Sequence, residues 1–381
     1  MSLLSDHRLL ICVGSGGVGK TTLSASLALG AAMQGKRVLV LTIDPARRLA
    51  NSLGLPLFGN EAVRVELEGA AAGGELWAMM LDPGHTIRDL IERVSPDPQV
   101  AERILGNRIF RAIADSIAGS QDYMATEKLH DVVTHGGYDL VVLDTPPSTH
   151  AMDFLDAPGR LARFTDRQIM KWFLAPHEPQ AGLGRLLMGT SSIVFRLLGH
   201  IFGRAFLDEL SEFFQAFREL YDGFRSRSEE VIALFRARDT AFLVITAPNE
   251  ASVETARYFL GELRGRGMRC AGAVVNRCHL VSEQVPDVAL LSGLASALSA
   301  DLSPHTAETL LARLGAADRR LRELAQAEAR RIDHLRRAMA PGQAMWRVPR
   351  MEGEVHDLRA LTATAEHLLE PLPQPTAARR L

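Results

Sequence analysis

The stretch GSGGVGKTT, residues 14–22, decides the fold of this chain. It follows the apolar run LLICV at residues 9–13 and leads into an Ala- and Leu-rich stretch with helical spacing. Residues 14–21 satisfy the pattern G-x-x-x-x-G-K-[ST], in which glycines let backbone N–H groups turn toward phosphate oxygens at the positive end of a helix. A strand, a glycine loop and a helix in this order predict a phosphate-binding loop.

The side chains at the end of this loop have separate expected roles. Lys20 would reach the β- and γ-phosphates of a nucleotide, and Thr21 would offer its hydroxyl to Mg²⁺. The full set of residues expected to bind the nucleotide through this loop is Gly16, Gly17, Val18, Gly19, Lys20, Thr21 and Thr22.

Short apolar runs separated by helical stretches predict a doubly wound, mostly parallel α/β sheet. These runs are residues 8–14, 36–44, 75–82, 138–144, 240–246 and 270–276, with 344–348 as a weaker candidate. Gly14, Asp44, Asp144 and Asn276 end four of them. Because ligands of such sheets bind at the carboxyl ends of the strands, we expect these four positions to converge.

Two of these strand ends are acidic and suit phosphoryl transfer. Asp144 follows LVVL and would hold the magnesium ion through a water molecule, while Asp44 follows VLVLTI and would orient or deprotonate an attacking water. Each taken alone also fits a turn cap, since Asp-Pro and Asp-Thr-Pro are common turn sequences. Behind a phosphate loop, they are better explained as catalytic together with Lys20.

The chain of 381 residues is longer than one compact core usually organises. We expect a nucleotide-binding core and a second lobe made of helical insertions that binds a client or partner. The core is assigned to residues 1–85, 137–159, 239–280 and 343–381, and the insertions to 86–136, 160–238 and 281–342.

Two of the insertions have recognisable helical patterns. Seven of the fifteen phenylalanines lie between Phe195 and Phe224 at helical spacing, which favours either a docking groove for an apolar helix or the packing of the lobe itself. In the last insertion, Ser303 and Pro304 predict the start of a long helix. Its apolar stripe comprises Leu310, Leu314, Leu321, Leu324, Ile332 and Leu335.

Composition restricts the compartment and the partners. A net charge of −2 gives no global attraction to nucleic acid or anionic lipid. The most apolar segment, residues 183–207, is interrupted by arginines and a histidine, so a membrane-spanning helix is not expected. Three cysteines without a CxxC pair predict neither a disulfide framework nor a zinc site. With no secretory signal expected, we place the protein in the cytoplasm.

Several motifs together resemble the anion-transporting ATPases, a P-loop family that includes the ATPase of bacterial arsenical pumps and the ATPase that targets tail-anchored membrane proteins. The motifs are GSGGVGKTT (14–22), TIDPARRLA (42–50), LVVLDTPPSTHAMDFL (140–155), AVVNR (273–277) and VPRMEGEV (348–355). The segments YMATEKL (123–129) and FLDAPGRL (154–161) are similar to a bacterial branch with mycobacterial members. The resemblance extends over most of the chain and implies a deviant Walker A ATPase that uses ATP and Mg²⁺ and works as a dimer.

The resemblance also implies roles for individual residues. Asp44 would be the hydrolytic aspartate, and Asp144 the switch aspartate near the metal. Asn276 would contact adenine, and the segment from Pro349 to Val355 would close over the base. His150 matches a histidine of the second switch, for which a structural role is an equal alternative.

The chain departs from the family pattern at Ser15, where relatives have a signature lysine that reaches a partner's phosphates across the dimer. Arg47 or Arg48 would have to supply that charge, or a lysine-bearing paralogue would provide it, so that the dimer would be a heterodimer and not a homodimer. The third alternative is slow hydrolysis, with the site used mainly as a nucleotide-gated switch. We favour hydrolysis that depends on a partner.

Other departures concern metals. Cys12, Cys270 and Cys278 read as buried structural thiols, so arsenite binding is not expected. The zinc clasp of the eukaryotic relatives is missing, so zinc is not expected either.

The function that these patterns predict is ATP binding and hydrolysis, with the nucleotide state rearranging the dimer and the helical lobe. That rearrangement would bind a hydrophobic client or a membrane-protein partner, which would hold the protein peripherally at a membrane. Two alternatives stay open: the energising subunit of an oxyanion efflux system, and a partition or positioning scaffold ATPase. The scaffold reading lacks an amphipathic tail and a basic surface.

Overall fold

A computed structural model of the chain describes residues 6–44, 48–56, 59–71, 73–95, 97–108, 121–146, 154–157, 225–281, 304–351 and 357–369, together with a few short pieces and single positions between them. The Phe-rich stretch that ends at Phe224 lies outside the described residues. The same is true of three single positions discussed above: Arg47, His150 and Ser303.

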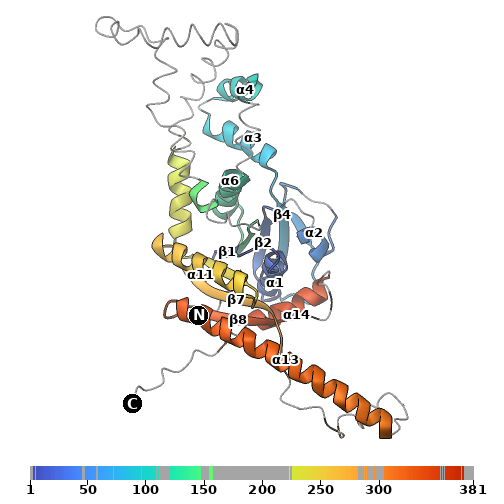
Figure 1. The fold of residues 1–381 in the computed structure, drawn as a ribbon. Helices are drawn as coiled ribbons and strands as arrows, with labels where there is room; N and C mark the ends of the chain where they lie inside the picture. The colour runs from blue at the N-terminus through green and yellow to red at the C-terminus, as the bar shows by residue number, and fades with distance from the viewer. Residues whose placement is uncertain are drawn as a thin grey trace, which may run out of the picture.

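Eight strands form one sheet in the order β3-β4-β2-β5-β1-β6-β7-β8 (Figure 1). They are β1 (Leu9–Val13), β2 (Arg37–Thr42), β3 (Val63–Val65), β4 (Glu75–Met80), β5 (Leu140–Asp144), β6 (Thr240–Thr246), β7 (Cys270–Cys278) and β8 (Ala344–Pro349). Every neighbouring pair is parallel except β3 with β4. The predicted doubly wound, mostly parallel sheet is therefore confirmed, including the weaker candidate that became β8.

The antiparallel edge strand β3 was not predicted. It has only three residues, and its middle residue, Arg64, is exposed. A run this short has too few alternating positions to show a strand period. It forms because β4 offers an unpaired edge at the end of the sheet.

Helices cover both faces of the sheet, which explains why β1 is apolar and buried at every position. On one face, α1 (Lys20–Met33) packs with α2 (Arg48–Leu53) and α14 (Leu358–Leu369). The side chains of Leu10 and Cys12 point into this layer. Leu9, Ile11 and Val13 point into the core of the opposite face.

The opposite side carries α6 (Gln121–His135), α11 (Glu250–Gly265) and α13 (Pro304–Ala338). Two further helices continue from it: α3 (Pro83–Val94) packs on α6, and α4 (Pro98–Gly106) packs on α3. Asp82 caps α3 by accepting hydrogen bonds from the backbone N–H groups of Gly84 and His85, and Asp97 caps α4 in the same way. The first helical stretch thus begins at Pro83, three residues before the boundary at 86 that the sequence suggested. In Figure 1, α3 and α4 lead away from the sheet.

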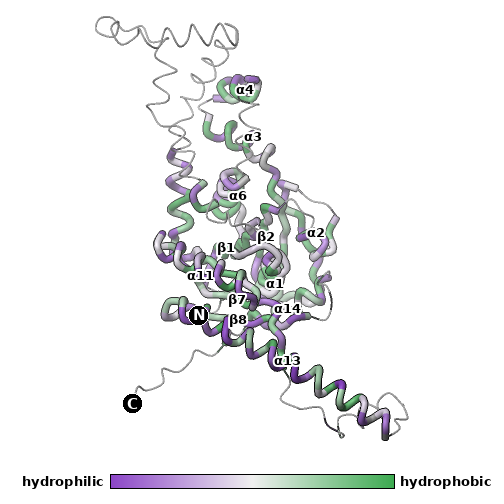
Figure 2. The backbone as a smooth tube through the Cα atoms, viewed as in Figure 1, coloured by the Kyte–Doolittle hydropathy of each residue, from purple (hydrophilic) through white to green (hydrophobic). Residues whose placement is uncertain are grey.

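The longest helix, α13, has 35 residues and runs past the edge of the sheet (Figure 1). Only the end of its predicted apolar stripe is buried, at Ile332 and Leu335, whereas Leu324 is 52% exposed. The exposed part is a mixture of hydrophilic and hydrophobic residues (Figure 2). Within the described helices, none combines the length and the hydrophobicity that a membrane crossing needs.

Candidate functional site

The phosphate loop joins β1 to α1 through two glycines with left-handed backbones. Gly17 has φ 75° and Gly19 has φ 91°. This left-handed conformation is energetically unfavourable for any residue that carries a Cβ atom. A Cβ on Gly19 would also lie 2.4 Å from Nδ2 of Asn276. Two separate reasons therefore require glycine at position 19: its left-handed backbone and the close approach of Asn276.

Lys20 bends back over this loop. Its Nζ donates to the backbone oxygens of Gly14 and Ser15, both at 3.0 Å, and only 6% of the residue is exposed. Burial lowers the pKa of Lys20, while the carboxylates of Asp144 and Asp44 favour its charged form. The ammonium group is thus held in the loop and is surrounded by groups that phosphate oxygens could replace.

Asp144 lies beneath Thr21 and is fully buried. Its Oδ2 accepts hydrogen bonds from Thr21 Oγ1 at 2.7 Å and from Thr42 Oγ1 at 3.0 Å. Burial raises the pKa of Asp144 to about 6, although both hydroxyl donors and the charge of Lys20 favour the carboxylate.

The other oxygen of Asp144, Oδ1, is buried and has no hydrogen-bond partner among the described residues. A buried carboxylate oxygen without a donor, beside the Thr21 hydroxyl, has the hard oxygen chemistry that Mg²⁺ and its bound waters prefer. The donor set therefore fits a hydrated magnesium ion held by Thr21 directly and by Asp144 through water.

Asp44 stands just after β2, on the far side of Thr42. Its backbone N–H donates to Thr42 Oγ1 at 3.2 Å, so one threonine positions both aspartates. Arg48, the first residue of α2, approaches Asp44 with 3.9 Å between Nη1 and Oδ2. The side chain of Arg48 is 64% exposed, so it is able to move toward another anion.

Asn276 closes the loop from the β7 side. Its Nδ2 donates to the backbone oxygen of Val18 at 2.8 Å, and its Oδ1 accepts from the backbone N–H of Arg277 at 2.9 Å. Each end of the carboxamide makes one of these bonds, which leaves one further N–H and one further lone pair with which Asn276 could contact a base. Contact with adenine stays a prediction.

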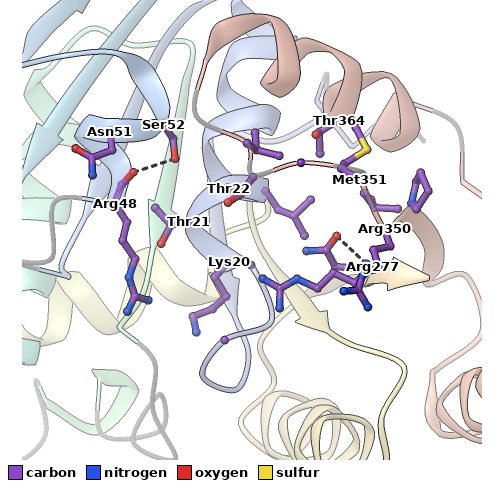
Figure 3. A pocket seen from close by; sticks show the side chains of 18 of the residues that line it. Lys20, Thr21, Thr22, Arg48, Asn51, Ser52, Arg277, Arg350, Met351 and Thr364 are labelled. Carbon is purple, nitrogen blue, oxygen red and sulfur yellow. Dashed lines mark hydrogen bonds between the residues drawn. The ribbon is translucent and has the colours of Figure 1, made fainter. Parts of the chain in front are cut away.

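These residues surround a cavity of about 1080 Å³ (Figure 3). The predicted residues that line it are Gly17, Gly19, Lys20, Thr21, Thr22, Asp44, Asn276 and Pro349. Gly16 and Val18 belong to the same loop but do not line the cavity, and Asp144 lies below its floor, next to the lining residue Thr145. The structure thus brings the predicted strand ends together, and their catalytic and binding roles stay predictions.

Arg277 and Arg350 are two further arginines of the cavity. They enter from the ends of β7 and β8, opposite Arg48 and beyond Lys20 (Figure 3). Arg350 and Met351 belong to the segment from Pro349 to Val355 that was expected to close over the base, whereas Arg277 was missed, although it directly follows Asn276. Asn51, Ser52 and Thr364 also line the cavity and were not predicted.

Ser15 does not line the cavity. Its Oγ donates to the Oγ of Ser252 at 3.3 Å, near the start of α11, so the side chain is turned toward the neighbouring helix. Arg47 and Arg48 were considered as sources of the charge that Ser15 lacks. Of these two, the structure describes Arg48, which lines the cavity.

The three cysteines fit the predicted structural role. Cys12 and Cys278 are buried and Cys270 is half-buried, and burial raises the pKa of each thiol to about 12. Thiols of this kind stay protonated near neutral pH and make poor metal ligands.

A parallel sheet with a phosphate loop, a loop lysine and two acidic strand ends defines the P-loop class of nucleotide-binding proteins. Within that class, this chain belongs to the anion-transporting ATPase family, whose family model matches residues 7–293.

Curated relatives match a shorter part of the chain. It is 36% identical over 153 residues to "ATPase get3" of Aspergillus terreus, 32% over 154 residues to "ATPase GET3" of Malassezia globosa and 35% over 153 residues to "ATPase get3" of Aspergillus niger. Each match covers 39–40% of this chain and 42–43% of the relative. The chain therefore spans less than half the length of the curated relatives that it matches.

Proposed function

We propose that this protein binds ATP with Mg²⁺ and hydrolyses it. The observation that carries the proposal is the convergence of Lys20, Thr21 and Asp44 on one cavity, with Asp144 hydrogen-bonded to Thr21 beneath it. These are the groups that phosphoryl transfer requires: a cation at the phosphates, a magnesium site, and a carboxylate that positions water.

In this proposal the loop and Lys20 bind the triphosphate. Nζ of Lys20 exchanges its two loop carbonyls for oxygens of the β- and γ-phosphates. Thr21 and Asp144 would hold Mg²⁺, which supplies neutralisation of the charge that develops on the phosphate oxygens. This exchange keeps the buried ammonium group paired throughout.

Asp44 is proposed to activate the attacking water. The water oxygen bonds to the γ-phosphorus, its proton passes to the carboxylate of Asp44, and the bond from the γ-phosphorus to the bridging oxygen breaks to release ADP. Arg48 is paired with Asp44 before the nucleotide binds. The γ-phosphate offers a stronger anion, so Arg48 would transfer to it from Asp44.

We further propose that the nucleotide state moves the helical lobe and a dimer interface to bind a hydrophobic client or a membrane-protein partner. Family membership supports this, as does the way α3 and α4 lead away from the sheet (Figure 1). Both helices follow β4, and β4 pairs with β2, the strand that ends next to Asp44. A movement of Asp44 would thus pass to β2, through the hydrogen bonds between β2 and β4, and along the chain from β4 into α3 and α4.

The test compares two substitutions in the site. Lys20→Ala is expected to abolish ATP binding, because the triphosphate loses its buried cation. Asp44→Asn is expected to keep binding within a few-fold while turnover falls by at least about a hundredfold, since the carboxamide cannot accept the proton. Binding is measured by calorimetry and turnover by phosphate release.

Asp333→Asn, an exposed carboxylate on α13, is the matched control and is expected to behave as the parent protein. Turnover by Asp44→Asn at the parental rate would remove Asp44 from the mechanism. ATP binding by Lys20→Ala at the parental affinity would remove the phosphate loop from it.

A further inference from the structure

Thr42 is the last residue of β2, and only 1% of it is exposed. The two neighbouring strands fix its position. It lies beside Asp144 in the register of β2 with β5, and its backbone oxygen accepts a hydrogen bond from the N–H of Leu81, just after β4. The side chain is also branched at Cβ and has few allowed rotamers. Thr42 can therefore hold other groups at fixed positions.

The hydroxyl group of Thr42 has a partner on each side. It donates to Oδ2 of Asp144 at 3.0 Å and accepts from the backbone N–H of Asp44 at 3.2 Å. A threonine oxygen that accepts from the N–H two residues further on directs the chain as it leaves the strand. Because a hydroxyl group has one proton, that proton is used for Asp144 and a lone pair is used for Asp44. The two bonds share one oxygen atom.

Packing alone does not require a hydroxyl group at this position. The four residues before Thr42 in β2 are apolar and fully buried, and a valine would fill the space of the threonine equally well. A valine would, however, remove the acceptor of the Asp44 N–H and one of the two hydroxyl donors to Asp144. The hydroxyl group thus serves the two aspartates and not the core.

We propose that Thr42 is a positioning residue whose hydroxyl group couples Asp144, at the metal site, to Asp44, the carboxylate that activates water. This inference rests on the proposed function, because it names the link between two groups of that site. Thr21 and Thr42 share Oδ2 of Asp144 in the structure. With Thr21 bound to the metal, Thr42 is the threonine that still donates to this oxygen.

The direction of the coupling follows from the shared oxygen. Hydrogen bonds in a chain polarise one another, so a hydroxyl group that donates more strongly also accepts more strongly. A stronger bond from Thr42 to Asp144 therefore strengthens the bond from the Asp44 N–H to Thr42. Occupation of the metal site would in this way hold Asp44 in place, so that the water-activating carboxylate is ordered when the nucleotide is ready to react.

Turnover kinetics separate this role from packing. Thr42→Val is expected to lower kcat by about 10- to 100-fold with KM for ATP within about threefold, because Asp44 is displaced while the phosphate loop is intact. Thr42→Ser keeps the hydroxyl group and is expected to recover most of the turnover. When Thr42→Val is added to Asp44→Asn, the further loss is expected to be less than about threefold, since Thr42 acts through Asp44.

Hydrogen exchange at Asp44, followed by mass spectrometry, tests the link without turnover. In the parent bound to a non-hydrolysable ATP analogue, addition of Mg²⁺ is expected to slow this exchange by about 2- to 10-fold. In Thr42→Val the exchange is expected to be faster and not to respond to Mg²⁺. Thr246→Val is the matched control: Thr246 is buried at the end of β6, and its hydroxyl group donates to the backbone oxygen of Ala247. It is expected to leave kcat, KM and the exchange at Asp44 unchanged.

Several outcomes overturn the inference. Parental kcat in Thr42→Val, or an equal loss in Thr42→Ser, would assign Thr42 to packing. A full further loss in the Asp44→Asn background would show that Thr42 does not act through Asp44. If Thr42→Val does not fold, Thr42→Ala carries the same tests, because it also removes the hydroxyl group. A parent protein that neither binds nor hydrolyses ATP would reject the proposed function itself, whereas parental exchange at Asp44 in the valine variant rejects only the coupling.

Discussion

Asp144 is a fully buried carboxyl group at the end of β5. The unfolded carboxyl has a pKa near 3.8, whereas burial raises the pKa of Asp144 to about 6 in the folded protein without a nucleotide. Between these values the folded state binds a proton that the unfolded state has released. The contribution of Asp144 to the free energy of unfolding therefore falls as the pH rises from about 4 to about 6, and the cost persists above pH 6.

Asp144→Asn is accordingly expected to stabilise the nucleotide-free protein. The carboxamide keeps an oxygen for Thr21 and Thr42 and carries no charge, so the free energy of unfolding at pH 8 should rise by up to about 3 kcal/mol. Urea unfolding between pH 4 and pH 8 measures this. The same substitution should abolish stabilisation by ATP with Mg²⁺, because the metal loses its carboxylate.

The control for this prediction is Asp333→Asn, which removes an exposed carboxylate from α13. It should leave the pH dependence of unfolding unchanged. If Asp144→Asn destabilised the protein at pH 8, the buried carboxylate would contribute more through its two threonine partners and Lys20 than it loses through burial.

Among the elements, β7 connects the site to the longest helix. It supplies Asn276 to the phosphate loop and Arg277 to the cavity, and it ends one residue before His279. The backbone N–H of His279 donates to Glu328 Oε2 at 2.9 Å, and its Nδ1 lies 2.6 Å from Glu328 Oε1. One buried carboxylate on α13 thus fastens the helix to the end of the strand.

Glu328→Gln is expected to lower the free energy of unfolding by about 1–3 kcal/mol, because the amide has one acceptor where the carboxylate had two. Hydrogen exchange should also become faster at the N–H of His279. Urea unfolding and exchange followed by mass spectrometry measure the two effects. Glu323→Gln, an exposed position of the same helix, is the control; equal losses in both variants would mean that the fastening to His279 contributes nothing.

The strands of the sheet were predictable because parallel strands buried on both faces read as continuous apolar runs. β1 and β6 are buried throughout and were found with nearly their true bounds. The edge strand β3 was missed because its pairing depends on β4, not on its own pattern. For α13, the leucine pattern predicted a helix but could not show that only its last turns would pack.

The residues of the site could be predicted from the sequence about as well as the strands of the sheet. The phosphate loop has a spacing that only one chemistry explains, and the two aspartates follow apolar strands. Arg277 could not be found in the same way, because a bulge in β7 places it in the cavity. The bond from Asn276 to Val18 joins residues 258 positions apart, a distance at which local patterns carry no information.

For the whole molecule, the orientation of Ser15 bears on assembly. Its hydroxyl group is engaged with α11, so the phosphate loop presents no side-chain charge outward at the position where the family resemblance implies a lysine. A second subunit would have to contribute that charge, or Arg48 would have to replace it within the chain. Hydrolysis by the isolated protein should therefore be limited by the missing cation.

We expect the purified chain to bind ATP with Mg²⁺ and to turn it over slowly, with a rise of at least about tenfold when a lysine-bearing paralogue is added. Turnover and mass in solution are measured with and without ATP. Robust turnover accompanied by ATP-induced homodimers would contradict this expectation. Arg48→Ala would then identify whether Arg48 supplies the charge.

The central position of β1 also has a consequence for synthesis on the ribosome. This strand is made before its neighbours in the sheet, which begin at Leu140 and Thr240, and before Asn276, the residue that locks its loop. Both of its edges stay unpaired until those strands have been made, and long-range parallel pairing is slow and prone to aggregation. Nascent chains that end before Asn276 should depend on chaperones and should lack a nucleotide site that is locked in place.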